Sequence, residues 1–428
     1  RYQFHKWSQV SAGSCFKRPY EIMATIRISM ADCPPGTRPA VKSVARCRIQ
    51  FSCCNASAPA TRLESECSRI QYDVYPRSPS SVSIMKIHLR FLALLGLLVI
   101  FGVDAAVAEP TRILMLAGGR SHSSGDHEFN AGCLLLANAL NEQSGLDVEA
   151  SVIKGWPEDE TVFDGVDAVI IYADGTSVVR NGWEKVDQLA KSGVGLMFMH
   201  YAVHPSAAEG DRFYRPWIGG AFETGFSVNP HWVADLKTLP GHPVSNGITG
   251  PVRSYDEFYY AIRFPADRNH VLDLVTGTPT KSRIKRIINL WNENGVSGIN
   301  KPQTLMWGIE RKDGGRGVGF TGGHYHRNWA VDGFRQIVLN AIVWVAGMEV
   351  PEDGVNSRSL TEDELNANLD DYEGQENPWI PLPNVDEYMA LPPAKFVTAE
   401  EHAAAAAKTK ADRAARQRMK RLRNAEKK

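Results

Sequence analysis

The stretch Gly193-Val194-Gly195-Leu196-Met197-Phe198-Met199-His200-Tyr201-Ala202 decides the fold. Its apolar run follows a glycine, contains no charged residue and stops at a histidine, which is typical of a strand buried on both faces. Further mainly apolar runs that predict strands occur at 112–119, 148–153 and 167–172. Apolar residues at helical spacing predict helices at 128–143 and 182–191.

Buried strands that alternate with helices predict a doubly wound, flavodoxin-like parallel sheet of the α/β class. Between Pro216 and Gly315 the pattern becomes irregular and rich in strand-forming residues, so we expect an elaboration beside the main sheet. Candidate strands of this elaboration are 232–239, 258–262 and 271–276. Regularity returns with a strand at 317–323 and a helix at 331–346.

Residues 85–108 have the composition of a secretory signal peptide. A basic start, Met85 to Arg90, precedes an apolar run at 91–103 and the small residues Ala106-Val107-Ala108. The apolar run is shorter than the roughly 20 residues that span a bilayer, so a transmembrane anchor is the weaker alternative. We therefore expect an exported, periplasmic or secreted protein that begins near Glu109 and keeps no stable membrane span after processing.

A signal peptide leads the nascent chain, so translation is expected to start at Met85. Residues 1–84 are then a spurious or disordered upstream extension. They hold six of the seven cysteines without any C-x-x-C pair, which makes a zinc or disulfide module the weaker alternative. Only Cys133 lies downstream, so the mature chain cannot form an internal disulfide.

The working part is expected to be a single domain, residues 109–350. A polar, proline-rich wrapping extension follows at 351–393, and a basic helical or disordered tail at 394–428. This tail is expected to solubilise the chain; contact with an anionic polymer or membrane is the alternative. Residues 1–84, 85–108 and 394–428 carry net charges of +7, +1 and +7, so the neutral chain leaves −15 for residues 109–393. A domain this acidic is not expected to bind nucleic acid.

Polar side chains follow the predicted strands where each strand ends, which is where open parallel sheets bind ligands. These side chains are His122 and His127 after the first strand, His200 and Tyr201 after the fourth, and His324 and His326 after the last. A further group, Asp256-Glu257-Phe258-Tyr259, is expected to begin a strand of the irregular region. Imidazole can exchange a proton or bind a metal near neutral pH, so several histidines at one sheet edge indicate a site.

At these residues the chain resembles the ThuA-like (trehalose-utilisation) family, from about Arg112 to Gly347. The resemblance rests on the His127 segment, 193–202, Gly219-Gly220-Ala221-Phe222, His242-Pro243, 256–259 and 315–324. It implies a fold similar to class I glutamine amidotransferases and a role in carbohydrate use. In amidotransferases a cysteine nucleophile stands at the turn after the fourth strand, whereas this chain has His200 there. Cys133 falls within the first helix, so glutamine hydrolysis through an acyl-enzyme is not expected.

The resemblance further implies acid/base lyase, hydrolase or isomerase chemistry on an oxidised, 3-keto sugar or glycoside. Such chemistry needs groups that transfer protons and an electrophile near the carbonyl. The catalytic candidates are His200, His127, His324 and Glu257, and the substrate-binding candidates are His122, Tyr201, Asp256, Tyr259 and His326. No cofactor is certain, although a divalent metal is a possible electrophile. The expected partner is a small carbohydrate; the alternative function is a non-catalytic sugar-binding protein, and no oligomeric state is indicated.

Overall fold

The computed structural model describes residues 48–51, 70–73, 109–287, 290, 292–371 and 378–397, and 400–401, 403–404, 407–412, 415–416 and 418 of the tail. The chain divides into two compact units, Arg1–Val107 and Ala108–Lys428. In the first unit, β1 (Arg48–Phe51) and β2 (Ile70–Asp73) pair as antiparallel strands. The expected signal peptide lies outside the described residues. Within the described part of the chain, no helix combines the length and apolarity needed to cross a membrane.

The second unit is built on a sheet whose parallel half has the expected flavodoxin-like strand order. Its strands lie in the order β4 (Val148–Lys154), β3 (Thr111–Ala117), β5 (Ala168–Tyr172), β6 (Gly195–Met199), β12 (Arg316–Phe320). All neighbours in this series run parallel. Numbered along the chain, the order is 2-1-3-4-5, which confirms the predicted doubly wound α/β class.

The strand-rich segment continues this sheet with antiparallel strands. Beyond β12 lie β11 (Gln303–Glu310), β9 (Leu272–Gly277), β7 (His231–Thr238) and β10 (Ile284–Arg286), and β8 (Val252–Asp256) pairs with β7. The expectation of a strand at 258–262 is wrong, because the strand ends at Asp256 and only Tyr260 forms an isolated bridge, with Val228. Asp256 therefore ends strand β8 and Glu257 follows it, instead of the two residues beginning a strand.

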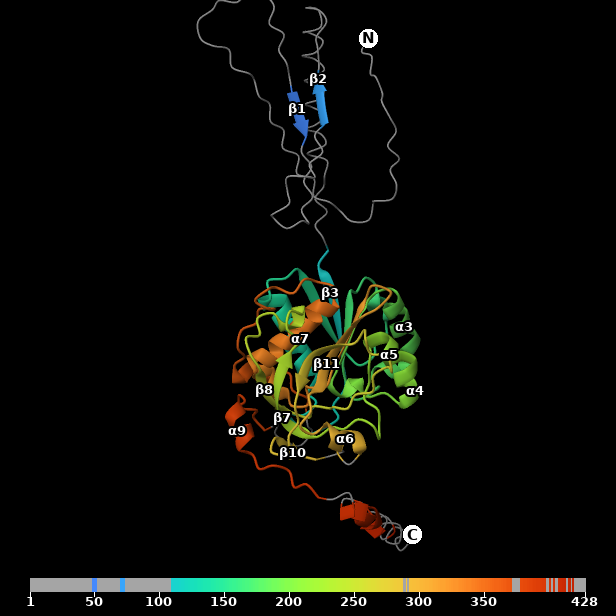
Figure 1. The fold of residues 1–428 in the computed structure, drawn as a ribbon, viewed down its shortest axis with the longest axis vertical. Coiled ribbons are helices and arrows are strands. Elements are labelled where there is room, and N and C mark those ends of the chain that lie inside the picture. The colour runs from blue at the N-terminus through green and yellow to red at the C-terminus, as the bar shows by residue number, and fades with distance from the viewer. Residues whose placement is uncertain are drawn as a thin grey trace, which may run out of the picture. The chain divides into compact units, whose positions relative to one another are not determined.

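Helices cover both faces of the sheet because alternate residues of each buried strand point to opposite sides. Ile113 and Met115 join one core cluster with α2 and α7, whereas Leu114 and Leu116 join another with α3 and α5. Figure 1 shows α7 on one face and α3 and α5 on the other. The longer helices are α2 (Phe129–Asn138), α3 (Trp183–Lys191) and α7 (Asp332–Val345), and the short ones are α4 (Ala207–Glu209), α5 (Arg215–Ile218), α6 (Glu293–Gly298), α8 (Glu362–Leu365) and α9 (Val385–Ala390).

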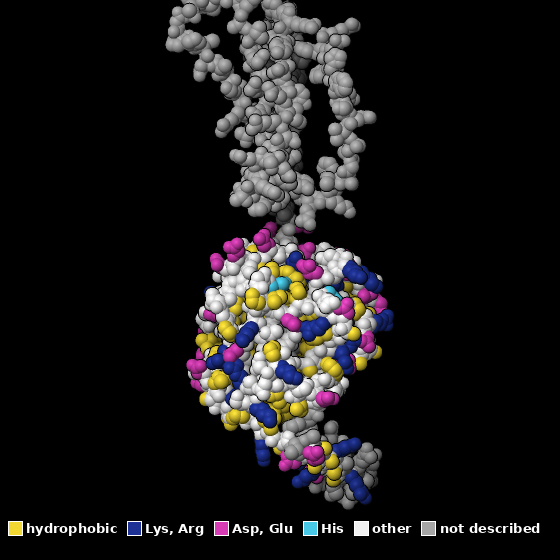
Figure 2. Space-filling view, viewed as in Figure 1, with side chains coloured by type: hydrophobic (Ala, Val, Ile, Leu, Met, Phe, Trp, Pro, Cys, Tyr) yellow, Lys and Arg dark blue, Asp and Glu magenta, His cyan; other side chains and the backbone are white. Residues whose placement is uncertain are grey.

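The segment after Pro351 lies on the surface of the domain and is fixed by side chains of the domain. Asn340, fully buried in α7, accepts a hydrogen bond from the backbone of Val355. Farther along, Asp370 pairs with Lys154, and the ring of Tyr388 lies 5.4 Å from that of Tyr255. In the view of Figure 2, the Lys and Arg side chains of the second unit are scattered among acidic and apolar ones without forming a continuous basic surface.

Candidate active site

A cavity of about 410 Å³ opens at the edge where the parallel strands end. The segments that follow β3, β6 and β8 line its walls. Its lining residues are His122, His127, Tyr201, His204, Phe222, Thr224, Asn229, Glu257 and Tyr259. One wall is aromatic, and the floor is formed by imidazole and carboxylate groups.

Three imidazoles and one carboxylate converge at the floor of this cavity, where His127 and Glu257 line it and His200 and His324 lie directly behind them. The Nε2 atom of His127 lies 2.9 Å from Nε2 of His200 and 2.9 Å from Nδ1 of His324. An oxygen of Glu257 lies 3.1 Å from Nδ1 of His324 and 3.6 Å from Nε2 of His200. All four side chains are buried, and their facing atoms lie within 4.8 Å of one another.

Contacts behind the rings fix the orientation of each imidazole. Nδ1 of His200 lies 3.0 Å from the carbonyl oxygen of Thr321, and Nδ1 of His127 lies 3.1 Å from the Ser121 hydroxyl. His200 and His127 both have positive φ angles, 53° and 57°, an uncommon backbone conformation for residues other than glycine. His200 directly follows β6, whereas His127 lies two residues before α2, so the uncommon conformation occurs where β6 ends and just before α2 begins.

Asp256 holds the loop that carries His324. Its buried carboxylate accepts hydrogen bonds from the backbone N–H groups of Gly323 at 2.7 Å, His324 at 3.0 Å and Tyr325 at 3.3 Å. It does not line the cavity, so the structure places this substrate-binding candidate behind the site.

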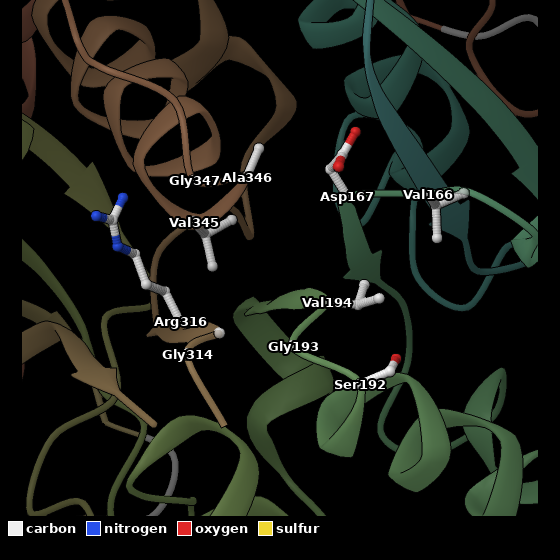
Figure 3. Close-up of a pocket in the computed structure, with 11 residues that line it drawn as sticks. Val166, Asp167, Ser192, Gly193, Val194, Gly314, Arg316, Val345, Ala346 and Gly347 are labelled. Atoms are coloured by element: carbon white, nitrogen blue, oxygen red, sulfur yellow. The ribbon is translucent and has the colours of Figure 1, made fainter. Parts of the chain in front are cut away.

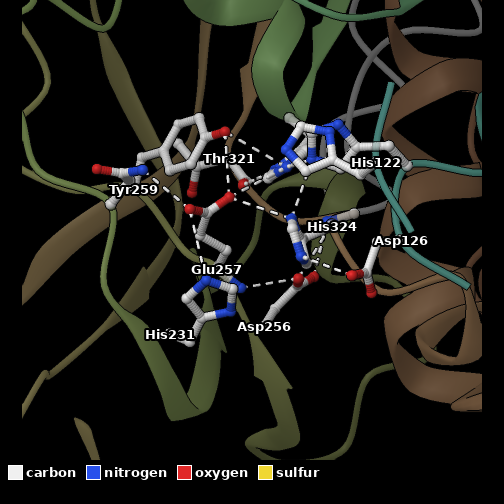
Figure 4. A network of polar contacts seen from close by, with 12 residues as sticks. His122, Asp126, His231, Asp256, Glu257, Tyr259, Thr321 and His324 are labelled. Atoms are coloured by element: carbon white, nitrogen blue, oxygen red, sulfur yellow. Dashed lines mark hydrogen bonds and ion pairs between the residues drawn. The ribbon is translucent and has the colours of Figure 1, made fainter. Parts of the chain in front are cut away.

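Glu257 is held from two further sides. Asn229 donates a hydrogen bond of 2.9 Å to its Oε1 atom, and Nε2 of His231 lies 3.6 Å from the same oxygen. Nδ1 of His231 in turn lies 2.8 Å from the hydroxyl of Tyr325. Figure 4 shows the carboxylate between Tyr259, His231 and His324. The carboxylate therefore has a fixed position beside the imidazoles.

Burial keeps the imidazoles neutral. It lowers the pKa of His200 and of His324 to about 3, and it also lowers the pKa of His127 below the ordinary value. Burial also raises the pKa of Glu257, while the hydrogen bond from Asn229 opposes this shift. A neutral imidazole exposes a lone pair on one ring nitrogen, which is the form that binds metal ions.

Hydrogen bonds among the four side chains do not give every nitrogen and oxygen atom that faces the centre a suitable partner. A carbonyl oxygen only accepts, so Nδ1 of His200 carries the proton and its Nε2 presents a lone pair to the centre. His127 Nε2 has two ring nitrogens at 2.9 Å but can donate a single proton to only one of them. A cation at the centre would attract all four atoms. The facing atoms of the four groups all lie within 4.8 Å of one another, so a single ion placed among them would contact all four.

The donor set therefore fits a divalent transition metal, held by His127, His200, His324 and Glu257. The contacts behind the rings resemble the outer shell of metal sites, where a ligating histidine usually engages a carboxylate or carbonyl through its other nitrogen. Asp126 lies 3.8 Å from the outer nitrogen of His324, and Asp174 lies 4.0 Å from that of His127.

The structure brings together eight of the nine residues predicted for the site. His122, Tyr201 and Tyr259 line the cavity with His127 and Glu257, His200 and His324 complete the floor, and Asp256 lies directly behind it. His326 lies apart, because its Nε2 atom is bonded to the carbonyl oxygen of Leu365.

Sequence reasoning missed several residues of the site, foremost the fully buried His231. It is the first residue of β7, an antiparallel strand that begins at the cavity edge. Phe222 belongs to the motif Gly219-Gly220-Ala221-Phe222, but this motif did not indicate a residue of the site. Thr321 lies within the motif at 315–324 but was likewise not assigned to the site. The other missed residues, Asn229, His204 and Thr224, belong to no recognisable pattern.

A second cavity of about 310 Å³ lies at the opposite edge, before β5, β6 and β12 begin. Figure 3 shows that glycine backbone and small side chains form much of its wall. Its charged groups are engaged with backbone: Asp167 accepts from the N–H of Arg112, and Arg316 donates to the carbonyl oxygen of Trp344. The lining of this second cavity contains no histidine or cysteine. The candidate site is therefore the first cavity, which holds the His–Glu cluster.

This geometry defines the class of protein: an α/β domain with flavodoxin-like strand order and a buried His₃Glu cluster. Residues 112–345, more than half of the chain, match the model of the ThuA (trehalose utilisation) family, so the chain belongs to that family. The predicted resemblance is confirmed, and it links the chain to carbohydrate use.

Two crystal structures of ThuA-like proteins are similar to the chain. The protein of Parabacteroides merdae is 16% identical with a TM-score of 0.42, over 58% of this chain and 98% of that one. The protein of Bacteroides uniformis is 15% identical with a TM-score of 0.42, over 57% of this chain and 95% of that one. A search of curated proteins found no match.

Proposed function

We propose that the protein is a metal-dependent enzyme that processes an oxidised, 3-keto sugar or glycoside by lyase, hydrolase or isomerase chemistry. The observation that carries the proposal is the convergence of three neutral imidazoles and one carboxylate on a single point at the cavity floor. Hydrogen bonding to sugar hydroxyls does not require such a cluster, whereas binding a metal does.

The metal, held by His127, His200, His324 and Glu257, would polarise a carbonyl oxygen and stabilise the negative charge that develops on it. A ketone beside a C–H group makes that hydrogen acidic. When a base removes the proton, the C–H electron pair enters the enolate, and a glycosidic oxygen on the next carbon can then leave with a proton from an acid. Isomerisation begins with the same proton removal.

The chain offers further groups for substrate binding and proton transfer above the floor. His122 lies at the cavity wall, with its ring centre 3.7 Å from that of His127. The hydroxyl of Tyr259 lies 3.3 Å from His200 and 3.5 Å from Glu257. We assign proton transfer to these two side chains, because the four groups of the floor are occupied with the metal.

The aromatic wall suits a sugar ring, whose apolar C–H face packs on aromatic side chains while its hydroxyls need donors and acceptors. Phe222 and His204 lie with ring centres 4.1 Å apart, and Tyr201 lies 5.2 Å from His204. Asn229 and Thr224 supply polar groups between this wall and the floor. A pocket of this composition admits a small carbohydrate.

The decisive experiment measures bound metal and turnover on the same preparation. We expect about one equivalent of a divalent transition metal by elemental analysis, and turnover of 3-keto-glycosides but not of the matching unoxidised glycosides. Dialysis against a chelator should abolish turnover, and adding the metal back should restore it. Full activity of metal-free protein would contradict the metal role, and tight sugar binding without any turnover would instead support a sugar-binding protein.

We also propose that the protein is exported and that its mature chain begins near Glu109. The signal-like series at 85–108 supports this proposal. Strand β3 begins at Thr111, so cleavage before Glu109 removes no strand of the domain.

A further inference from the structure

The loop that carries His127, residues 120–128, is connected to the segment of the chain after Pro351. Glu128, only 1% exposed, joins the two. Its Oε1 atom accepts a hydrogen bond of 3.0 Å from the N–H of Gly125, and its Oε2 atom accepts one of 2.7 Å from the N–H of Asp370. One carboxylate thus links the loop to a residue 242 positions away.

Other contacts lie on both sides of this link. Arg120, at the start of the loop, donates a hydrogen bond of 2.6 Å to the carbonyl oxygen of Asp371. Asp370 forms an ion pair of 2.8 Å with Lys154, the last residue of β4. The side chain of Ile380 lies against Gly125. The loop is therefore held between the sheet and the extension.

The position of His127 explains why such support matters. Its φ angle of 57° is costly for a residue other than glycine, and such a conformation persists only where the surroundings impose it. The backbone of His127 donates to His324 on one side, and Glu128 is the next residue on the other. A loop released from Glu128 would relax, and the His127 ring would leave the point on which the four groups converge.

We propose that Glu128 is a positioning residue, through which the C-terminal extension holds the His127 loop in the geometry that binds the metal. This inference rests on the proposed function for the metal itself. It gives the extension a role in the site, although the described residues of the extension do not line the cavity.

The test compares Glu128→Gln with the wild-type protein and with a matched control, Asn340→Ala. An amide in place of the carboxylate presents an N–H group to one of the two backbone donors, so one hydrogen bond becomes a repulsive contact. Asn340 is equally buried and makes three hydrogen bonds, one of them to the extension at Val355, but none to the His127 loop. Both variants should lower the melting temperature.

Two readouts separate positioning from stability, both taken well below the melting temperature. The first is Co²⁺ affinity with its visible absorption spectrum, where Glu128→Gln should bind more weakly by roughly tenfold or more, the lower end of the effect of losing a group that orients a ligand directly. The second is hydrogen–deuterium exchange of residues 120–128 without metal, which should be faster in Glu128→Gln alone. Asn340→Ala should match the wild type in both.

Lys154→Gln is a second variant, in case Glu128→Gln does not fold. It removes the anchor of Asp370 from a half-exposed position and should weaken Co²⁺ binding in the same direction. Unchanged exchange and unchanged Co²⁺ affinity in the folded variants would overturn the inference. If the wild type binds no Co²⁺, the proposed metal role fails, and the exchange of residues 120–128 still decides whether Glu128 holds the loop.

Discussion

The Nδ1 atom of His200 lies 3.0 Å from the carbonyl oxygen of Thr321, so the proton of the neutral ring is on Nδ1 and Nε2 faces the cluster. Replacing His200 with Asn should keep the fold, because the smaller amide fits the same space, but it removes the inward nitrogen. Because His200 is a proposed ligand of the metal, we expect turnover on a 3-keto-glycoside to fall by roughly a hundredfold or more as the charge stabilisation by the metal is weakened. Steady-state kinetics and the melting temperature should be measured together.

His242→Asn is the matched control for this prediction. That imidazole accepts a hydrogen bond from the backbone of Val244 and lies outside the cavity. Its loss should affect stability alone. A His200→Asn protein that is destabilised but fully active would refute a catalytic role for His200.

Asp256→Asn should destabilise the protein through the loop that holds His324. An amide offers one acceptor where the carboxylate offers two, so a buried N–H of Gly323, His324 or Tyr325 loses its partner. The free energy of unfolding should fall by about 2 kcal/mol, the scale for leaving a buried donor unpaired. Urea denaturation measures the change. Asp235→Asn, which weakens partly exposed pairs with Arg253 and Arg283, should cost less than about 1 kcal/mol, and an equal loss in both variants would contradict this prediction.

Cys133→Ala should retain activity, because the thiol is packed in the core beneath α2 and not at the site. We expect a stability loss of about 1 kcal/mol from the vacated volume. Burial raises the pKa of the Cys133 thiol, so native protein should also resist alkylation by iodoacetamide until it is unfolded. Mass spectrometry follows the labelling, and an inactive but folded Cys133→Ala protein would restore a thiol mechanism.

N-terminal sequencing of the protein from a periplasmic or secreted fraction should identify Glu109 as the first residue, give or take a few positions. The physical reason is the Ala106-Val107-Ala108 series after the apolar run, which has the small residues that a signal peptidase requires at its cleavage site. A control substitution, Ala108→Leu, should block processing because the cleavage position needs a small side chain. A mature form that retains residues 1–84 would contradict both the start site and the export.

The parallel half of the fold and the histidines at its edge could be predicted because their signal is local. An uninterrupted apolar run marks each buried strand, and the residue after the run, such as His200, is then at the carboxyl edge. This relation between the end of an apolar run and the carboxyl edge of the sheet holds only for the parallel strands. His231 was missed because β7 runs in the opposite direction and begins at the cavity edge, so its first residue, not its last, faces the site.

Other parts depend on contacts that no local pattern encodes. Asp256 was expected to bind substrate, but it accepts backbone hydrogen bonds from a loop 67 residues later in the chain. His326 follows His324 by two residues, yet a 3-10 turn begins there and directs its ring to Leu365. Strand β11 was not predicted, because its mixture of polar and apolar residues lies within the irregular region.

The placement of Glu257 on the antiparallel side of the sheet has a consequence for how the protein reaches its active state. Strands β6 and β12 are neighbours in the sheet but are separated by more than a hundred residues of chain, and Glu257 belongs to the segment between them. Pairings between such distant segments form slowly, because a long loop must close before any contact compensates for it. The three histidines and the carboxylate can therefore meet only after this closure. Metal capture would be a late event after synthesis, and its rate would report when the two halves of the sheet have joined.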